Sequence, residues 1–279
     1  MPGLLYGITV VISTGSHELV IGADRKVQFW KPTRYGLLSR WWPRWRKRVA
    51  EPASPDTTVT KLFRIGDRLA VASYGLMHSD LQPEFFYSFP VWLQRVTANF
   101  NAHSPGELAA YLHRMVDCQL LPVMDIGTRR GYFRAVKGPG DTLLGIAIVG
   151  LDPIHKHPEV YQVRLDIRDD GQGVELPELM QEFSGPQSVH LTLGMQSAIG
   201  QLSSDMGKLE QMNTLQARLR GPLHAQLRNV SPMTLDLALL TASMLELQAQ
   251  AIPGMVGCGS DLLVIEPTRT VVVNLDALM

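Results

Sequence analysis

The sequence predicts an α+β fold in which helices cover the outer faces of antiparallel sheets. Its expected elements come in groups: strands, two helices, more strands, two more helices and a closing pair of strands. Helices grouped between hairpins pack on antiparallel sheets, whereas a doubly wound parallel fold alternates single strands and helices. The chain also contains neither GxGxxG nor GxxxxGK[ST], the glycine-rich loops that bind phosphate in such parallel folds.

Two pairs of strands are expected near the start of the chain. Residues 9–12 and 19–26 are rich in strand-forming residues and are joined by the polar residues 13–18, which predicts a hairpin. A second pair covers residues 60–65 and 69–75, with Gly-Asp-Arg as the turn between them.

The stretch between these two pairs, residues 27–57, has a different composition. It holds four of the five tryptophans of the chain and a dense set of basic residues. These residues are Trp30, Trp41, Trp42 and Trp45, with Lys31, Arg34, Arg40, Arg44, Arg46, Lys47 and Arg48. The stretch ends in Glu-Pro-Ala-Ser-Pro-Asp at residues 51–56, a loop signal. We therefore interpret residues 27–57 as an insertion between the second and third strands.

Four helices are expected, in two pairs. The first pair covers about 83–100 and 104–121, and the second pair covers about 195–219 and 232–250. The second helix of the first pair begins with Ser-Pro-Gly-Glu at residues 104–107, a capping box with proline at the first helical position.

Two further pairs of strands complete the predicted fold. Residues 143–153 form a buried apolar run, and residues 160–165 alternate as its hairpin partner. A polar segment without assigned structure separates this hairpin from the second pair of helices. Residues 261–265 and 270–275 are expected to form the closing strands.

Composition limits the remaining classes of protein. With 279 residues, 45% hydrophobic residues and no Ser/Gly-rich linker, the chain is expected to form one domain over residues 1–279. The formal net charge is zero, which favours no particular class of partner and argues against nucleic acid or a membrane surface.

The cysteines and the N-terminal residues give further expectations. Cys118 and Cys258 make neither a disulfide framework nor a zinc spacing, so we expect two small buried apolar residues and no metal or cofactor. The first residues lack the basic and apolar regions of a signal peptide, and no apolar run reaches the roughly 18 residues that span a bilayer. A cytoplasmic protein is therefore expected.

Asp24 and Lys61 each place one charge within an apolar strand pattern. A carboxylate and an ammonium that neighbouring strands bring together either stabilise each other or tune a nucleophile. A purely structural ion pair, of Asp24 with Arg25 or with Lys61, is the alternative to a catalytic role.

The arrangement of these motifs resembles that of proteasome β-type subunits and their bacterial relatives. Residues 20–26 resemble the second strand of that family, and residues 60–75 resemble its lysine strand and glycine-ended strand without a gap. Residues 148–153 and 158–163, the late helix and the closing hairpin follow in the order of the family. The resemblance covers most of the chain except the insertion, and it implies a four-layer α/β/β/α sandwich of the N-terminal-nucleophile hydrolase type.

The resemblance also implies a site. In that family an N-terminal threonine attacks the amide, a buried aspartate–lysine pair assists, and a backbone N–H of the glycine strand stabilises the oxyanion. By position Asp24 would be the aspartate, Lys61 the lysine and Gly75 the oxyanion donor, with Thr9 as the nucleophile after removal of eight residues.

The sequence departs from the family pattern around the nucleophile. The spacing from Thr9 to Asp24 is one residue shorter than in the family, and a slip of one residue turns a side chain to the other face of a sheet. Aligning the apolar residues instead puts Gly7 or Tyr6 at the nucleophile position, which leaves no hydroxyl. Removal of Met1 alone would expose Pro2, which has no hydroxyl either.

Two supporting positions differ as well. The serine that the family carries before the late helices is replaced here by Met195. The second aspartate and serine of the family fall at residues 253–257, where neither residue type occurs.

Three functions are open at this point. The first is a threonine-type peptidase subunit of a homo-oligomeric ring that cleaves peptides and works with an ATP-driven unfoldase. The second is a catalytically inactive proteasome-like scaffold or partner-binding subunit. The third is a nucleic-acid or membrane module that uses the Trp/Arg-rich residues 29–48. The insertion itself would contact a neighbouring subunit, line the substrate cleft, or bind nucleic acid or a membrane.

Overall fold

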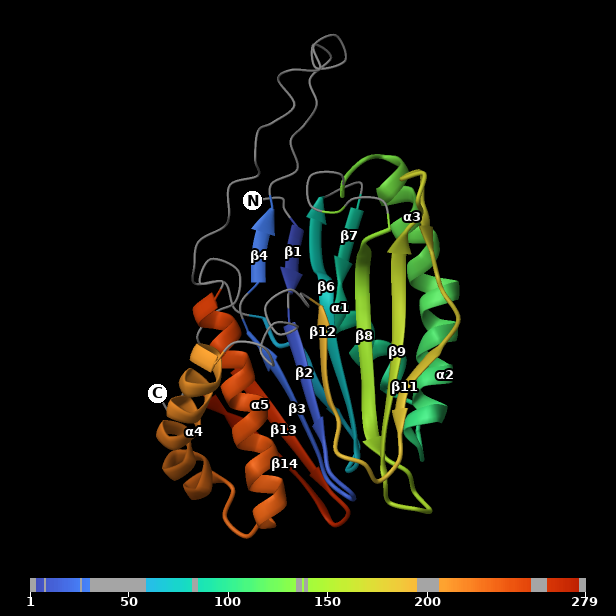
Figure 1. The fold of residues 1–279 in the computed structure, drawn as a ribbon. Coiled ribbons are helices and arrows are strands. Elements are labelled where there is room, and N and C mark those ends of the chain that lie inside the picture. The colour runs from blue at the N-terminus through green and yellow to red at the C-terminus, as the bar shows by residue number, and fades with distance from the viewer. Residues whose placement is uncertain are drawn as a thin grey trace.

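The computed structural model describes residues 4–7, 9–25, 27–30, 59–81, 85–133, 137, 140–194, 206–251 and 260–275. These residues form two antiparallel sheets with helices on their outer sides (Figure 1). The mixed α+β class predicted from the grouping of the elements is therefore confirmed.

The first sheet is built around the long strand β6. Its strands are β1 (Leu4–Gly7), β4 (Val27–Trp30), β5 (Leu62–Ile65), β6 (Leu69–Leu81), β7 (Phe85–Ser88), β8 (Thr142–Leu151), β9 (Pro158–Ile167), β10 (Val174–Glu175) and β11 (Met180–Ser184). The main path runs β10-β9-β8-β6-β1-β4, while β11 pairs with β9, and β5 and β7 pair with β6. Strand β8 pairs with one edge of β6 from Leu69 to Gly75. On the opposite edge, β5 pairs with Leu69–Ala72 and β1 pairs with Gly75–Ser79.

The second sheet contains the predicted N-terminal hairpin and the closing strands. Its strands are β2 (Thr9–Thr14), β3 (Leu19–Asp24), β12 (His190–Gly194), β13 (Ser260–Glu266) and β14 (Arg269–Asn274). They are ordered β12-β2-β3-β13-β14. The hairpin of β2 with β3 and the hairpin of β13 with β14 both confirm the predictions from runs of strand-forming residues.

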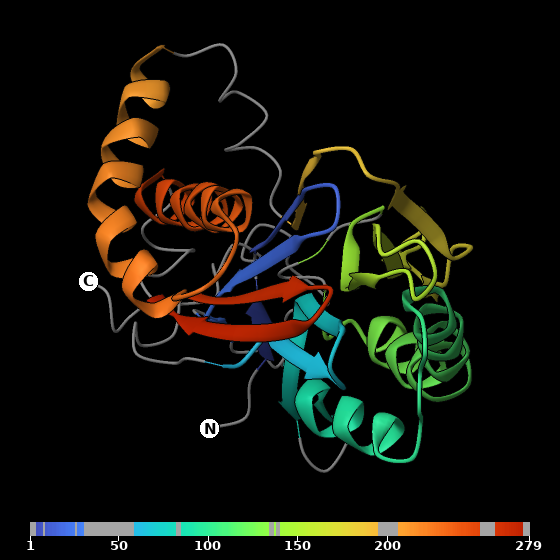
Figure 2. The same cartoon turned by 90° about the horizontal axis from the view of Figure 1, so that it is seen from below.

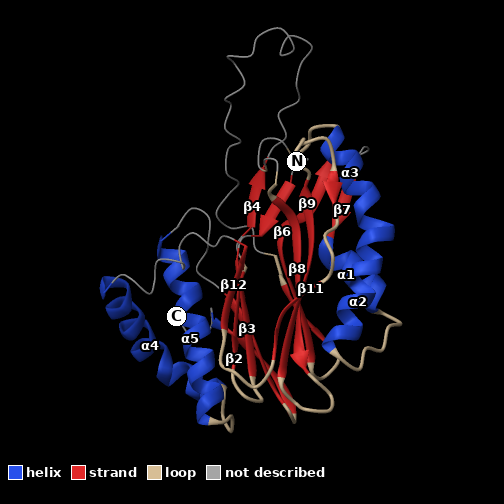
Figure 3. Cartoon of the chain, turned by 45° about the vertical axis from the view of Figure 1, so that its right-hand side comes forward, coloured by secondary structure: helices blue, strands red, loops and turns tan. Residues whose placement is uncertain are grey.

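The helices lie on both sides of the paired sheets (Figures 2 and 3). They are α1 (Phe89–Thr97), α2 (Pro105–Met115), the π-helical turn η3 (Val116–Leu120), α3 (Leu121–Arg129), α4 (Met206–Gln226) and α5 (Pro232–Ala251). Helix α2 begins as its sequence predicts, because the Ser104 hydroxyl accepts a hydrogen bond from the Glu107 N–H at 3.1 Å.

Three apolar clusters hold these elements together. One lies between α1–α3 and the first sheet, one between the two sheets, and one between the second sheet and α4–α5. Strands β2 and β3 contribute alternate residues to the last two clusters, so both of their faces are buried. Val10, Ile12, Leu19 and Ile21 face the first sheet, and Val11 and Val20 face the helices.

The structure corrects the prediction of one helix over residues 83–100. Within that range, residues 85–88 form strand β7, which pairs with the end of β6. Phe85 and Tyr87 are buried and Phe86 is exposed, the period of a strand, and α1 then begins at Phe89 with Pro90 in its first turn.

The prediction that the next helix ends near residue 121 is also wrong. The helix continues through η3 into α3, with Pro122 in the first turn of α3. Proline cannot donate the intrahelical hydrogen bond, and the wider π-turn directly before it lets the helix continue past this position.

The polar segment after β9 contains β10, β11 and β12, which the sequence pattern did not indicate. Among the described strands, β12 lies at the edge of the second sheet, and β11 pairs with β9 alone. Edge strands keep one side exposed, so their hydrophobic pattern is weak. Of the predicted insertion over residues 27–57, residues 27–30 form β4 in the first sheet, and residues 31–57 lie outside the described residues, as do Met195 and residues 253–257.

Cys118 is exposed in η3, contrary to the expectation of a buried residue, and Cys258 lies outside the described residues. Among the helices in the described ranges, none is both long enough and apolar enough to cross a membrane.

Candidate functional site

Asp24 and Lys61 form a fully buried ion pair. Lys61 Nζ lies 2.8 Å from Asp24 Oδ1, and neither side chain is exposed to solvent. Arg25, the other cation beside Asp24 in the sequence, donates from Nε to Asp261 at 2.8 Å instead. The structure thus decides between the two possible partners: Lys61 pairs with Asp24, and Arg25 pairs with Asp261.

The pair lies where the chain passes between the two sheets. Strand β1 belongs to the first sheet and is followed by β2 in the second, while β3 in the second sheet is followed by β4 in the first. Asp24 is the last residue of β3, and Lys61 directly precedes β5. Both crossings therefore lie next to the buried charges.

Burial changes the chemistry of Lys61. Removal of the ammonium from water lowers the pKa of Lys61, and the Asp24 carboxylate opposes that effect by charge and hydrogen bonding without cancelling it. A buried lysine with a lowered pKa gives up its proton more easily than a lysine in water. This property suits an amine that assists a nucleophile, and it also occurs in structural ion pairs.

Thr9 joins the pair through its backbone. The Thr9 N–H donates to the same Asp24 Oδ1 at 3.3 Å, whereas Thr9 Oγ1 is buried and has no hydrogen-bond partner among the described residues. Alternation along β2 places Thr9 on the face of Val11 and Ser13, which α5 covers. The nitrogen of Thr9 is therefore at the ion pair, and its hydroxyl belongs to the interface with α5.

Gly75 adopts a conformation that glycine alone readily provides. Its φ is +84°, and a Cβ there would collide with the Leu143 carbonyl oxygen. The register of β1 on β6 puts Gly7 opposite Gly75. A Cβ on Gly7 would lie 2.7 Å from Lys61 Cε, so Gly7 connects the lysine to the glycine strand. The structure thus gathers Thr9, Asp24, Lys61 and Gly75 around Gly7.

Strand β1 fills a gap in the first sheet beside this site. It pairs antiparallel with β6 on one side and with β4 on the other, from Leu4 to Gly7. Both of its edges are therefore hydrogen-bonded, and Leu4–Gly7 occupy the place of an extended strand between β6 and β4.

Two residues near this site were not found from the sequence. Ser260 is buried and lies opposite Asp24 in the register of β13 with β3. Gln248 is buried on α5, and both its amide atoms lack hydrogen-bond partners among the described residues. No local motif marks either one, because only the packing of distant segments brings them to this end of the second sheet.

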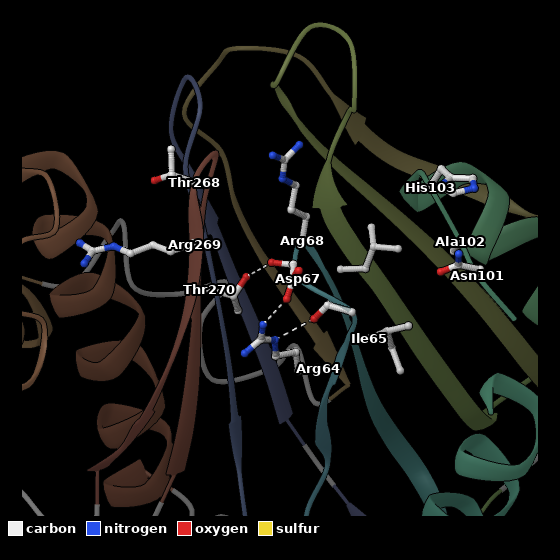
Figure 4. Close-up of a pocket in the computed structure, with 12 residues that line it drawn as sticks. Arg64, Ile65, Asp67, Arg68, Asn101, Ala102, His103, Thr268, Arg269 and Thr270 are labelled. Carbon is white, nitrogen blue, oxygen red and sulfur yellow. Dashed lines mark hydrogen bonds and ion pairs between the residues drawn. The ribbon is translucent and has the colours of Figure 1, made fainter. Parts of the chain in front are cut away.

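An open depression of about 650 Å³ lies at the opposite end of the sheets (Figure 4). It is bounded by the β5–β6 turn, the residues before α2 and the β13–β14 turn. Arg64 is committed to Asp67 and to the Gly66 carbonyl, and Arg269 to Glu266 at 2.7 Å. Since β5 separates this depression from Lys61, it belongs to a different part of the molecule from the buried ion pair.

No group of three or more His, Cys, Asp or Glu residues suited to hold a metal ion occurs in the described part of the chain. No protein-family model matches the sequence, and a search of curated proteins finds no match.

Proposed function

We propose that this protein is an amide hydrolase of the N-terminal-nucleophile type, with Thr9 as the nucleophile after loss of residues 1–8. The observation that carries the proposal is the convergence of Thr9 N and Lys61 Nζ on one buried oxygen, Asp24 Oδ1, at 3.3 and 2.8 Å. The helices and three apolar clusters on either side of the sheets support a four-layer α/β/β/α sandwich, the fold that such an enzyme would use.

The reaction follows from groups on the chain. Cleavage between residues 8 and 9 would convert the Thr9 peptide nitrogen into an amine beside its own hydroxyl. The amine takes the hydroxyl proton as Oγ1 attacks the amide carbon, and it then protonates the leaving amine as the C–N bond breaks. Water hydrolyses the resulting ester and restores the hydroxyl.

The other members of the site would support these steps. Asp24 would hold both Thr9 N and Lys61, and the Lys61 amine, with its lowered pKa, would assist proton transfer. The Gly75 N–H would stabilise the negative oxygen of the tetrahedral intermediate.

The pairing of β1 supports a peptide as substrate. If residues 1–8 leave, β6 and β4 each lose a hydrogen-bonded neighbour. An extended peptide can replace a missing strand by pairing its backbone with such edges. We further propose a homo-oligomeric ring in the cytoplasm that is supplied by an ATP-driven unfoldase, as the resemblance implies.

A catalytically inactive scaffold is the second candidate. It is favoured by Thr9 Oγ1, which makes no hydrogen bond to Lys61 in the uncleaved chain, and by residues 4–7, which are part of the first sheet. In that case Asp24 and Lys61 would stabilise the crossings between the sheets.

Intact mass of the purified chain, with no tag at its N-terminus, separates the two candidates. A mass that begins at Thr9 supports the hydrolase, provided that the Thr9→Ala variant shows neither this processing nor any peptide hydrolysis. A mass that retains residues 2–8, with no hydrolysis of a mixed fluorogenic peptide library, rejects it in favour of the scaffold.

A further inference from the structure

The amide of Gln248 is a buried polar group without a described partner. The residue is 2% exposed, and neither Nε2 nor Oε1 accepts or donates a hydrogen bond within the described part of the chain. An unpaired buried amide costs about 1–3 kcal/mol per polar group. Such a group in a well-packed interface calls for a specific explanation.

Gln248 lies on the side of α5 that faces the second sheet. Leu237 lies near Gly15, Thr241 Oγ1 donates to Ser13 Oγ at 2.8 Å, and Leu245 lies against Gly22. Gln248 follows Thr241 by seven positions and Leu245 by three, so it lies on the same side of the helix in the following turn.

The direction of α5 brings that turn towards Thr9. From Thr241 to Gln248 the helix advances about 10 Å, and from Ser13 back to Thr9 the strand covers about 13 Å. Because α5 runs antiparallel to β2, both steps lead to the same end of the sheet. Thr9 Oγ1, on the face that α5 covers, is also a buried polar atom without a hydrogen-bond partner in the described residues.

We propose that Gln248 is a positioning residue for the Thr9 hydroxyl, an inference that rests on the proposed function. Gln248 Nε2 reaches Thr9 Oγ1 through one shared water, since the two atoms make no direct hydrogen bond, and the hydroxyl proton is left for the Thr9 amine. The buried Ser260 lies on the same helix-facing side, because alternation along β13 places it with Leu262.

The proposed role of residue 248 requires a hydrogen-bond donor that serves Thr9 Oγ1 through the shared water and does not titrate. A carboxylate in place of the amide would accept the hydroxyl proton and compete with the Thr9 amine. Glutamine presents an N–H that does not titrate, so it orients Oγ1 without taking part in proton transfer.

Kinetics of Gln248→Met and Gln248→Glu, beside wild type, test the inference when the purified chain begins at Thr9. We expect kcat for a fluorogenic peptide to fall at least tenfold in both variants with KM within twofold. The Glu variant should also gain an additional ionisation in its pH profile. Gln250→Met, a substitution of an exposed residue on the same helix, is the matched control and should retain wild-type kcat.

Wild-type kcat in Gln248→Met overturns the inference, as does an equal loss in Gln250→Met. In both cases the proposed function stands as long as Thr9→Ala is inactive. If the purified chain instead retains residues 2–8 and is inactive, the proposed function fails, and a double-mutant cycle decides the inference by itself. Gln248→Met should then shift the urea midpoint in the Thr9 background and leave it unchanged in Thr9→Val; equal shifts overturn it.

Discussion

Gly7 and Lys61 lie so close that the lysine side chain occupies the space of a Cβ on the glycine. An added methyl group would come 2.7 Å from Lys61 Cε and 3.0 Å from Cδ. The lysine is fully buried here, with its ammonium fixed by Asp24, so it has little freedom to withdraw. The crossing from β1 to β2 therefore depends on a residue without a side chain.

Gly7→Ala is expected to destabilise the protein by about 1–3 kcal/mol, the usual cost of overpacking a core. Urea denaturation followed by circular dichroism measures the change. Gly221→Ala is the control, because no atom lies within 4 Å of a Cβ at that exposed position of α4. There alanine should stabilise the helix by up to about 1 kcal/mol. Equal stability of Gly7→Ala and wild type would contradict the close approach of Lys61.

Lys61→Met should cost about 3–5 kcal/mol, because it leaves the buried Asp24 carboxylate without its ammonium partner. The double variant Asp24→Leu with Lys61→Met should recover part of this loss, since it leaves no unpaired buried charge. The exposed pair of Arg64 with Asp67 provides the comparison, and Asp67→Asn should change stability by about 0–1 kcal/mol. If Lys61→Met destabilises the protein by less than Asp67→Asn does, the pair of Asp24 with Lys61 is not buried in solution.

Stability should rise with pH through the titration of Lys61, in the range between its lowered pKa in the folded chain and its ordinary value. Because burial lowers the pKa of Lys61 below its ordinary value of about 10.4, the unfolded chain binds more protons than the folded chain in this window. Each rise in pH therefore favours the folded state until the ordinary pKa is reached. Urea midpoints across this range should increase for wild type and less steeply for Lys61→Met. Parallel slopes would show that Lys61 keeps an ordinary pKa when folded.

Gly75→Ala should destabilise the protein by more than Gly66→Ala. Both glycines have positive φ, +84° and +63°, so alanine adds backbone strain of about 1 kcal/mol or more at either position. Only Gly75 adds a collision, with the Leu143 carbonyl oxygen, whereas a Cβ on Gly66 meets nothing within 4 Å. Thermal unfolding of the two variants isolates the collision. Similar melting temperatures would mean that β8 moves aside without cost.

Short-range patterns were enough to predict much of the fold. Runs of strand-forming residues predicted the β2–β3 and β13–β14 hairpins, and Ser104 with Glu107 predicted the start of α2. The charges of Asp24 and Lys61 stood out because they interrupt apolar strands. The local pattern was misleading at β7 and silent at β11 and β12, where pairing with distant strands outweighs a weak local preference.

The sequence by itself singled out the candidate site residues, and the tertiary structure decided which of their atoms meet. Sequence alone left Asp24 with two possible cations, and the crossings between the sheets assign Lys61 to it and Arg25 to Asp261. Likewise, the strand pattern identified Thr9 but not the direction of its hydroxyl. That direction depends on α5, which begins more than two hundred residues later and covers one face of β2. The ion-pair partner of Asp24 and the direction of the Thr9 hydroxyl both depend on packing, because a strand has no buried face until another layer covers it.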